Sequence, residues 1–154
     1  MKIFCAIDLQ KYFSATTEQV ISQVVLELNK SISNKEPICL IQYSLGSWVR
    51  PQQKDIHEKI LETIDGYELA TVLTKDTDSA AKVIINYLSQ FSDTEHTIKI
   101  CGVNLEACVF KTIEELSAID SLKVQLLVKC CSGEKHPDSF FSQFSKMKNV
   151  SIIV

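Results

Sequence analysis

Six short apolar runs alternate with longer amphipathic segments along the 154-residue chain. Several runs show no polar alternation, which is typical of parallel strands buried on both faces. Helices between such strands cross back over the sheet and cover both of its faces. The pattern predicts a three-layer α/β/α fold with a mostly parallel six-stranded sheet, in one domain spanning 1–154. The predicted strands are 2–7, 38–42, 70–74, 97–103, 123–129 and 150–154.

The amphipathic segments predict the helices that cover this sheet. The strongest helical pattern covers 16–32, where Thr16 and Gln19 fit a capping box at the start. A second helix is predicted over 78–91, with Asp78 as its N-cap. Further helices are predicted directly after Cys108 and, from weaker patterns, over 54–64 and 137–147.

Charge and apolar content exclude several classes of protein. Sixteen basic and nineteen acidic residues give a formal net charge of −3, and the lysines are scattered, so we expect no nucleic-acid surface. The apolar runs are too short to span a membrane, and Asp8 interrupts the first one before a signal-peptide core could form. We therefore expect a cytoplasmic protein whose six cysteines are reduced.

Motifs for metals and nucleotides are missing from the sequence. There is no C-x-x-C pair, and the three histidines are widely separated, which disfavours a structural zinc site. No glycine-rich phosphate-binding motif follows any predicted strand, which disfavours nucleotide binding. We expect no cofactor.

Three chemically capable side chains follow predicted strands. Asp8 closes the first strand, Lys75 follows the third, and Cys108 comes shortly after the fourth. Taken singly, they fit a turn cap, a solvated loop lysine and a packed thiol. Parallel α/β sheets bind ligands beyond the carboxyl ends of their strands. An acid, a cation and a thiol together at that edge therefore predict a reactive cluster.

The combination has a chemical rationale. A cysteine nucleophile needs a proton acceptor and benefits from a lowered pKa. A helix start and Lys75 would lower the pKa of Cys108, and Asp8 would accept its proton. Glu106 adds negative charge near the same helix end. Its side chain must therefore point away for a thiolate to be favoured.

Three segments resemble the signature segments of the isochorismatase-like cysteine hydrolases, in the same order: AIDLQKYF (6–13), VLTKDTDSA (72–80) and CGVNLEACVFKT (101–112). The third is the most specific, and the resemblance spans nearly the whole chain. It implies that Asp8, Lys75 and Cys108 form a catalytic triad. It also implies hydrolysis of a small amide or related C–N bond through a thioester, with a small-molecule substrate and no organic cofactor.

The resemblance extends to the backbone near the nucleophile. Members of the family have a cis peptide bond after a Gly-Val pair, which places it here between Val103 and Asn104. The expected oxyanion donors are then the backbone N–H groups of Asn104 and Cys108.

Residues that bind substrate are also implied by the resemblance. Phe13 and an aromatic residue after the second strand, Tyr43 or Trp48, are expected to line the substrate pocket. For Trp48, packing in an interface is an equal alternative, because members commonly form homo-oligomers, and we expect one here. Gln10 is expected either to orient backbone at the site or to make a plain turn hydrogen bond.

Departures from the family pattern leave other readings open. Nicotinamidase-type relatives build a metal site from an Asp-x-His pair and a later histidine, but residues 42–59 contain one histidine, His57, and no later one. A zinc-dependent nicotinamidase is therefore disfavoured. Ala80 and Ala81 stand where many relatives carry an aromatic residue. Vinyl-ether cleavage of an isochorismate-type substrate and a non-catalytic, partner-binding role are the two alternatives.

Overall fold

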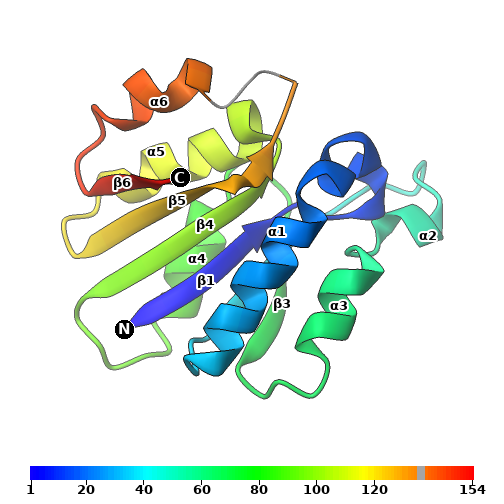
Figure 1. Cartoon of the computed structure of the whole chain (residues 1–154), viewed down its shortest axis with the longest axis horizontal. Coiled ribbons are helices and arrows are strands. Elements are labelled where there is room, and N and C mark those ends of the chain that lie inside the picture. The colour runs from blue at the N-terminus through cyan, green and yellow to red at the C-terminus, as the bar shows by residue number, and fades with distance from the viewer. Residues whose placement is uncertain (135–137) are drawn as a thin grey trace.

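The computed structural model describes residues 1–134 and 138–154 (Figure 1). Its six strands form one sheet in the order β3-β2-β1-β4-β5-β6, and every neighbouring pair is parallel. The predicted α/β fold is confirmed, and the sheet is entirely parallel rather than mostly so. The strands are β1 (Lys2–Ile7), β2 (Ile38–Tyr43), β3 (Ala70–Lys75), β4 (His96–Val103), β5 (Leu122–Ser132) and β6 (Val150–Ile153).

Helices cover both faces of the sheet. α1 and α3 lie on one face, and α4, α5 and α6 lie on the other (Figure 1). Residue 137, the first of the helix predicted over 137–147, lies outside the described residues. The helical elements are η1 (Lys11–Phe13), α1 (Ser14–Ser33), α2 (Pro51–Lys54), α3 (Glu58–Ile64), α4 (Ala81–Leu88), η2 (Leu105–Val109), α5 (Phe110–Ser117) and α6 (Asp138–Phe144).

The central strand β1 shows why the apolar runs lack polar alternation. All of its residues except Lys2 are buried, because helices pack on both faces. β5 is longer than predicted and includes Cys130, Cys131 and Ser132, after an irregularity in its pairing with β4 between Ile100 and Gly102. This extension carries β5 up to the edge of the sheet where the chain turns toward α6.

The predicted capping box at the start of α1 is wrong. Thr16 donates its hydroxyl hydrogen to the Phe13 carbonyl, and Gln19 donates to the Ala15 carbonyl. The 3₁₀ turn η1 leads directly into α1, so the chain has no extended N-cap residue there. A capping box needs an extended N-cap residue, because the side chain of that residue accepts a hydrogen bond from a free backbone N–H group in the first helical turn.

The second helix is shorter than predicted, and Asp78 is not its N-cap. α4 begins at Ala81, whose N–H donates to the hydroxyl oxygen of Ser79. Asp78 instead lies in the loop before the helix and pairs with Lys111 of α5. The loop that carries Asp78 therefore lies at the carboxyl-terminal edge of the sheet.

The helix predicted over 54–64 is two helices, α2 and α3. The break occurs because Ile56 forms an isolated antiparallel bridge with Gln10, which requires extended backbone. His57 then caps α3, its Nδ1 accepting a hydrogen bond of 3.3 Å from the Lys59 N–H. This bridge ties the segment after β2 to the segment after β1.

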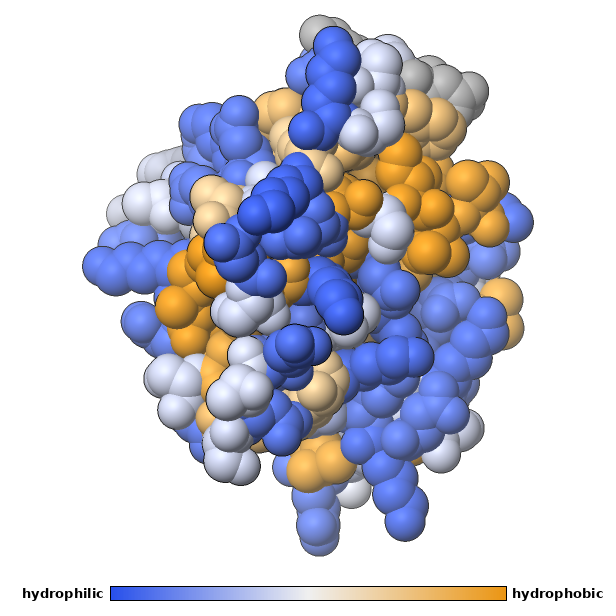
Figure 2. Space-filling view, turned by 90° about the vertical axis from the view of Figure 1, so that its left-hand side faces the viewer, coloured by the Kyte–Doolittle hydropathy of each residue, from blue (hydrophilic) through white to orange (hydrophobic). Residues whose placement is uncertain are grey.

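The end of the molecule at which the strands begin has a mixed surface. Figure 2 shows this side, the left of Figure 1, where hydrophobic residues gather in patches between hydrophilic ones. Among the described residues, no helix combines the length and the apolar character needed to cross a membrane. The strands end on the opposite side, where the predicted site residues lie.

Gly102 sets how closely β4 approaches the end of β1. Its φ is +133°, and a Cβ at this position would lie 2.1 Å from the carbonyl oxygen of Ile7. Only glycine fits both the backbone conformation and this contact. The close approach brings the segment after β4 next to Asp8, the residue that follows Ile7.

Candidate active site

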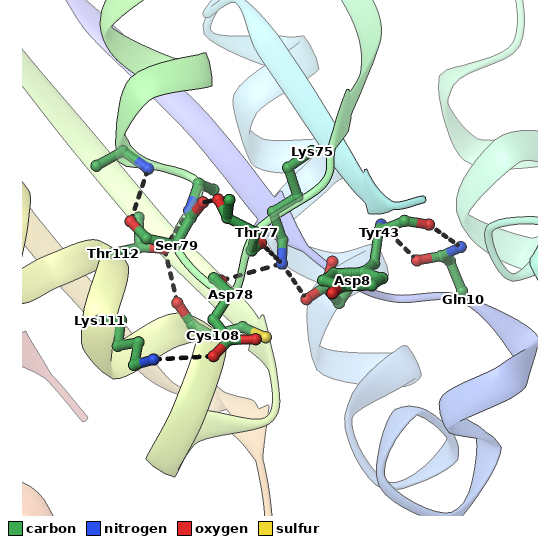
Figure 3. Close-up of polar contacts among 12 residues, drawn as sticks. Asp8, Gln10, Tyr43, Lys75, Thr77, Asp78, Ser79, Cys108, Lys111 and Thr112 are labelled. Atoms are coloured by element: carbon green, nitrogen blue, oxygen red, sulfur yellow. Dashed lines mark hydrogen bonds and ion pairs between the residues drawn. The ribbon is translucent and has the colours of Figure 1, made fainter. Parts of the chain in front are cut away.

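Asp8 is turned into the site by its backbone conformation. It has φ of +57°, in the left-handed region that Asp tolerates better than most residues. Its N–H donates to the Ile41 carbonyl at 2.8 Å, which anchors the turn to β2. The side chain is completely buried, and its Oδ2 lies 2.9 Å from Nζ of Lys75 (Figure 3).

Lys75 is a fixed ammonium at the end of β3. Besides Asp8, its Nζ donates to the carbonyls of Thr77 and Asp78, each at 3.0 Å. The ring of Tyr43 lies beneath it, with Nζ 4.5 Å from the ring centre. Two of the three N–H groups of the ammonium are engaged by carbonyl oxygens, and Asp8 contacts the ammonium as an ion pair. Lys75 can therefore supply positive charge at a defined position.

Cys108 lies in η2, a single π-helical turn that precedes α5. Val109 donates to the Asn104 carbonyl, five residues back, at 3.3 Å. Such wide turns within helices occur frequently at functional sites. Cys108 is thus the fourth residue of the helical segment rather than its first. Its sulfur lies on the side of Asp8 and Lys75 (Figure 3).

The predicted lowering of the pKa of Cys108 is wrong. Burial, followed by the neighbouring Asp8 carboxylate, raises the pKa of the thiol to about 11, although Lys75 acts in the opposite direction. Burial disfavours the thiolate, and a neighbouring carboxylate repels it. Cys108 is therefore a protonated thiol at neutral pH.

The carboxyl group of Asp8 is suited to receive that proton. Burial raises the pKa of Asp8, while Lys75 and the neighbouring Cys108 thiol lower it. Its Oδ2 is ion-paired with Lys75, and neither carboxylate oxygen accepts a hydrogen bond within residues 1–134 and 138–154. A desolvated carboxylate with one unengaged oxygen beside a thiol is a natural proton acceptor. The three groups together can generate a sulfur nucleophile.

Glu106 does not face this cluster. Its Oε1 accepts a hydrogen bond of 2.7 Å from the Glu134 N–H, in the loop after β5. Its Oε2 lies so close to Gly133 that a Cβ there would be 1.8 Å away. The carboxylate is held by that loop, and it is not among the groups that shift the pKa of Cys108.

The backbone before Cys108 bends sharply. The peptide bond between Val103 and Asn104 is cis. The Asn104 carbonyl accepts hydrogen bonds from the N–H groups of Ala107 and Val109. The assignment of the Asn104 and Cys108 N–H groups as oxyanion donors stays a prediction.

Gln10 is used entirely within the protein. It is buried, its Nε2 donates to the carbonyls of Tyr43 at 3.1 Å and Lys54 at 2.6 Å, and its Oε1 accepts from the Tyr43 N–H at 2.7 Å. Because the side-chain amide is engaged in backbone contacts, Gln10 orients the ends of β2 and α2. We therefore assign it no contact with substrate.

The other predicted pocket residues separate into two groups. Tyr43 lies under Lys75, whereas Phe13 and Trp48 are joined through Tyr12 by edge-to-face contacts with ring centres 5.1 and 5.6 Å apart. Trp48 is 72% exposed. Tyr12 was not predicted from the sequence, although its position directly before Phe13 was the available signal.

The segment after β2, where the sequence disfavoured a metal site, contributes His57 as its one histidine. His57 is buried, its Nδ1 accepts from Lys59, and its Nε2 lies 3.1 Å from Glu18. Both ring nitrogens therefore have partners. The described residues contain no cluster of three His, Cys, Asp or Glu side chains that could hold a metal ion. His136 lies outside them.

Comparison with known proteins identifies the fold. No protein-family model and no curated protein sequence matches the chain. Among solved structures, the nicotinamidase PncA from Bacillus subtilis is similar, with a TM-score of 0.83, 13% identity and coverage of 99% of both chains. The pyrazinamidase of Pyrococcus horikoshii in complex with zinc gives a TM-score of 0.75, 18% identity and coverage of 99% of this chain and 98% of that one.

An isochorismatase-like hydrolase from Alkaliphilus metalliredigens is also similar, with a TM-score of 0.76, 17% identity and coverage of 98% of this chain and 92% of that one. The chain therefore has the isochorismatase-like fold, over nearly its whole length. Identities this low establish the architecture, and the same architecture can support different chemistries. The reaction has to be argued from the site.

Proposed function

We propose that this protein is an isochorismatase-like cysteine hydrolase that cleaves a small amide or related C–N bond. The arrangement of Asp8, Lys75 and Cys108 carries the proposal: a buried carboxylate, an ammonium that is ion-paired with it and held by two carbonyls, and a thiol beside them. Among the six cysteines, all within the described residues, Cys108 alone is partly exposed. It is the one thiol that a substrate can reach.

The first half of the reaction forms the thioester. Asp8 takes the thiol proton as Sγ of Cys108 attacks the substrate carbonyl carbon, so that a C–S bond forms and the carbonyl oxygen becomes an oxyanion. The N–H groups of Asn104 and Cys108 stabilise that oxyanion. The intermediate collapses, Asp8 gives its proton to the leaving nitrogen, and the C–N bond breaks.

The second half releases the acid product. Asp8, again ionised, takes a proton from water, and the hydroxide attacks the thioester carbonyl. The C–S bond breaks, and Asp8 returns the proton to the departing sulfur of Cys108. Lys75 keeps its three partners throughout, holding Asp8 in place and offsetting the negative charge that moves between oxygen and sulfur.

The pH dependence follows from the direction of the Asp8 shift. Below its pKa, Asp8 is protonated and cannot accept the thiol proton, so activity falls as pH decreases. Burial raises the pKa of Asp8. The fall in kcat/KM should therefore be centred at a higher pH than is usual for an aspartate.

Ammonia release from a panel of small aliphatic and aromatic amides tests the proposal. We expect turnover of at least one amide by the wild-type protein, none by Cys108→Ala, and unchanged turnover by Cys130→Ala. Cys130 is the matched control, because it is buried in β5 and does not contribute to the pKa of Cys108 or Asp8. A thioester trapped on Cys108 and detected by mass spectrometry would identify the intermediate.

Activity that survives Cys108→Ala would refute the proposed nucleophile. If no amide turns over, isochorismate is the next substrate to assay, since vinyl-ether cleavage does not require the thiol. Inactivity on both would leave a partner-binding role for the fold.

A further inference from the structure

One buried hydroxyl joins the two segments that carry Lys75 and Cys108. Thr112 of α5 is completely buried, donates to the Cys108 carbonyl at 2.6 Å and accepts from the Ala80 N–H at 2.8 Å (Figure 3). The first bond holds the π-helical turn, and the second holds the loop before α4. A single Oγ therefore fixes both segments to each other.

The loop that Thr112 holds is the loop that holds Lys75. The carbonyls of Thr77 and Asp78 accept two of the three ammonium hydrogens, a few residues before Ala80. The Cys108 thiol and the Lys75 ammonium are therefore connected through the backbone of Cys108, the hydroxyl of Thr112 and this short loop. The proposed reaction uses both Lys75 and Cys108, so contacts outside the triad must fix their position relative to each other.

Other contacts between the loop and α5 lie at the surface. Asp78 pairs with Lys111 at 2.8 Å, and the Ser79 hydroxyl donates to Glu115 at 2.9 Å. The Asp78 and Lys111 side chains are 54% and 53% exposed, and exposed pairs of this kind contribute little. The Thr112 hydroxyl and its bond to Ala80 are buried, so breaking that bond leaves a buried N–H group without a partner.

We propose that Thr112 is a positioning residue for the hydrolase, and that its hydroxyl sets the position of the Lys75 ammonium relative to the Cys108 thiol. This proposal rests on the function proposed above. Valine has the shape of threonine but can neither donate to Cys108 nor accept from Ala80, so Thr112→Val removes both bonds with little change in volume. Thr112→Ser retains both.

Two measurements test this role. For an amide that the wild type cleaves, Thr112→Val should lower kcat by about tenfold or more with KM unchanged, because small displacements of reacting groups cost rate. The pH profile of iodoacetamide labelling of Cys108 should move to higher pH, because Lys75 lowers the pKa of that thiol and would no longer be held beside it. Thr112→Ser should restore both values.

Ser31→Ala is the matched control for the loss of a buried hydroxyl. Ser31 is completely buried and donates to Glu36 at 2.9 Å near the end of α1. It should lower thermal stability while leaving kcat and the labelling profile as in the wild type. The role is overturned if Thr112→Val leaves the profile unchanged, or changes it no more than Ser31→Ala does. The labelling needs no substrate, so this outcome is independent of whether any amide is cleaved.

Discussion

Two sides of the carboxyl edge are held in different ways. On the side of Lys75 and Cys108, hydrogen bonds and a buried ion pair fix the ammonium, and Thr112 joins the two segments that carry Lys75 and Cys108. On the side of the segment after β2, Trp48 is 72% exposed. It is held by the edge of the Tyr12 ring and by close contact with Gly46.

The difference separates two kinds of requirement. The proton transfer proposed between Asp8 and Cys108 would depend on short distances, which buried bonds can maintain. An exposed aromatic side chain can instead move to accommodate a ligand, and it contributes contact area rather than chemistry. We infer that the Lys75 side determines whether a bond is broken, and that the Trp48 side influences which molecule is bound.

The largest effect is expected from Asp8→Asn. Loss of the proton acceptor should reduce amide hydrolysis by about a thousandfold. Labelling of Cys108 by iodoacetamide near pH 8 should nevertheless become faster, because the carboxylate raises the pKa of the thiol. A decrease of one pKa unit increases the thiolate fraction about tenfold. Mass spectrometry of the labelled protein checks both the site and the rate.

Asp93→Asn is the control for Asp8→Asn, because Asp93 lies at the other end of the molecule, beside the amino group of Met1. It should change neither activity nor labelling. The other five cysteines are buried, so a single label shows that the variant is folded. Slower labelling of Cys108 in Asp8→Asn would contradict the assigned role of the carboxylate.

A smaller effect is expected from Gln10→Leu, which breaks the link between the two sides. It removes three hydrogen bonds and leaves backbone groups of Tyr43 and Lys54 without their partners. The free energy of unfolding should fall by at least about 2 kcal/mol, measured by urea denaturation. Gln53→Leu in α2, an exposed position, should change it by less than about 0.5 kcal/mol. Equal stability of the two variants would exclude a linking role for Gln10.

The strand pattern was sufficient to predict the architecture, because residues such as Ile3 to Ile7 are apolar at every position only when both faces are covered. Strand ends were also sufficient to nominate Asp8, Lys75 and Cys108, since parallel strands bring their ends to one edge. Those inferences need only local pattern and topology.

Properties that depend on packing could not be predicted. The pKa of Cys108 was predicted to fall, and it rises because burial and Asp8 outweigh Lys75. Spacing alone gives neither the depth of a thiol nor its distance from a carboxylate. Likewise, Asp78 fits the pattern of an N-cap, yet Lys111 of α5, far away in sequence, pairs with it. Contacts between elements decided both cases.

The smallest effect on the molecule is expected from Trp48→Ala, which addresses the exposed side alone. Its stability should remain within about 0.5 kcal/mol of the wild type, because the indole is mostly exposed. If the side chain contacts substrate, KM for a cleaved amide should rise several-fold while kcat stays constant, since uniform binding is lost and the triad is untouched. Leu69→Ala, at an exposed position before β3, is the matched control and should leave KM unchanged.

An unchanged KM together with a lower mass in analytical ultracentrifugation would instead place Trp48 in an interface between copies of the chain. Either result would show that this side can be altered without disturbing the bonds around Lys75, whereas a fall in kcat would show that the two sides are coupled.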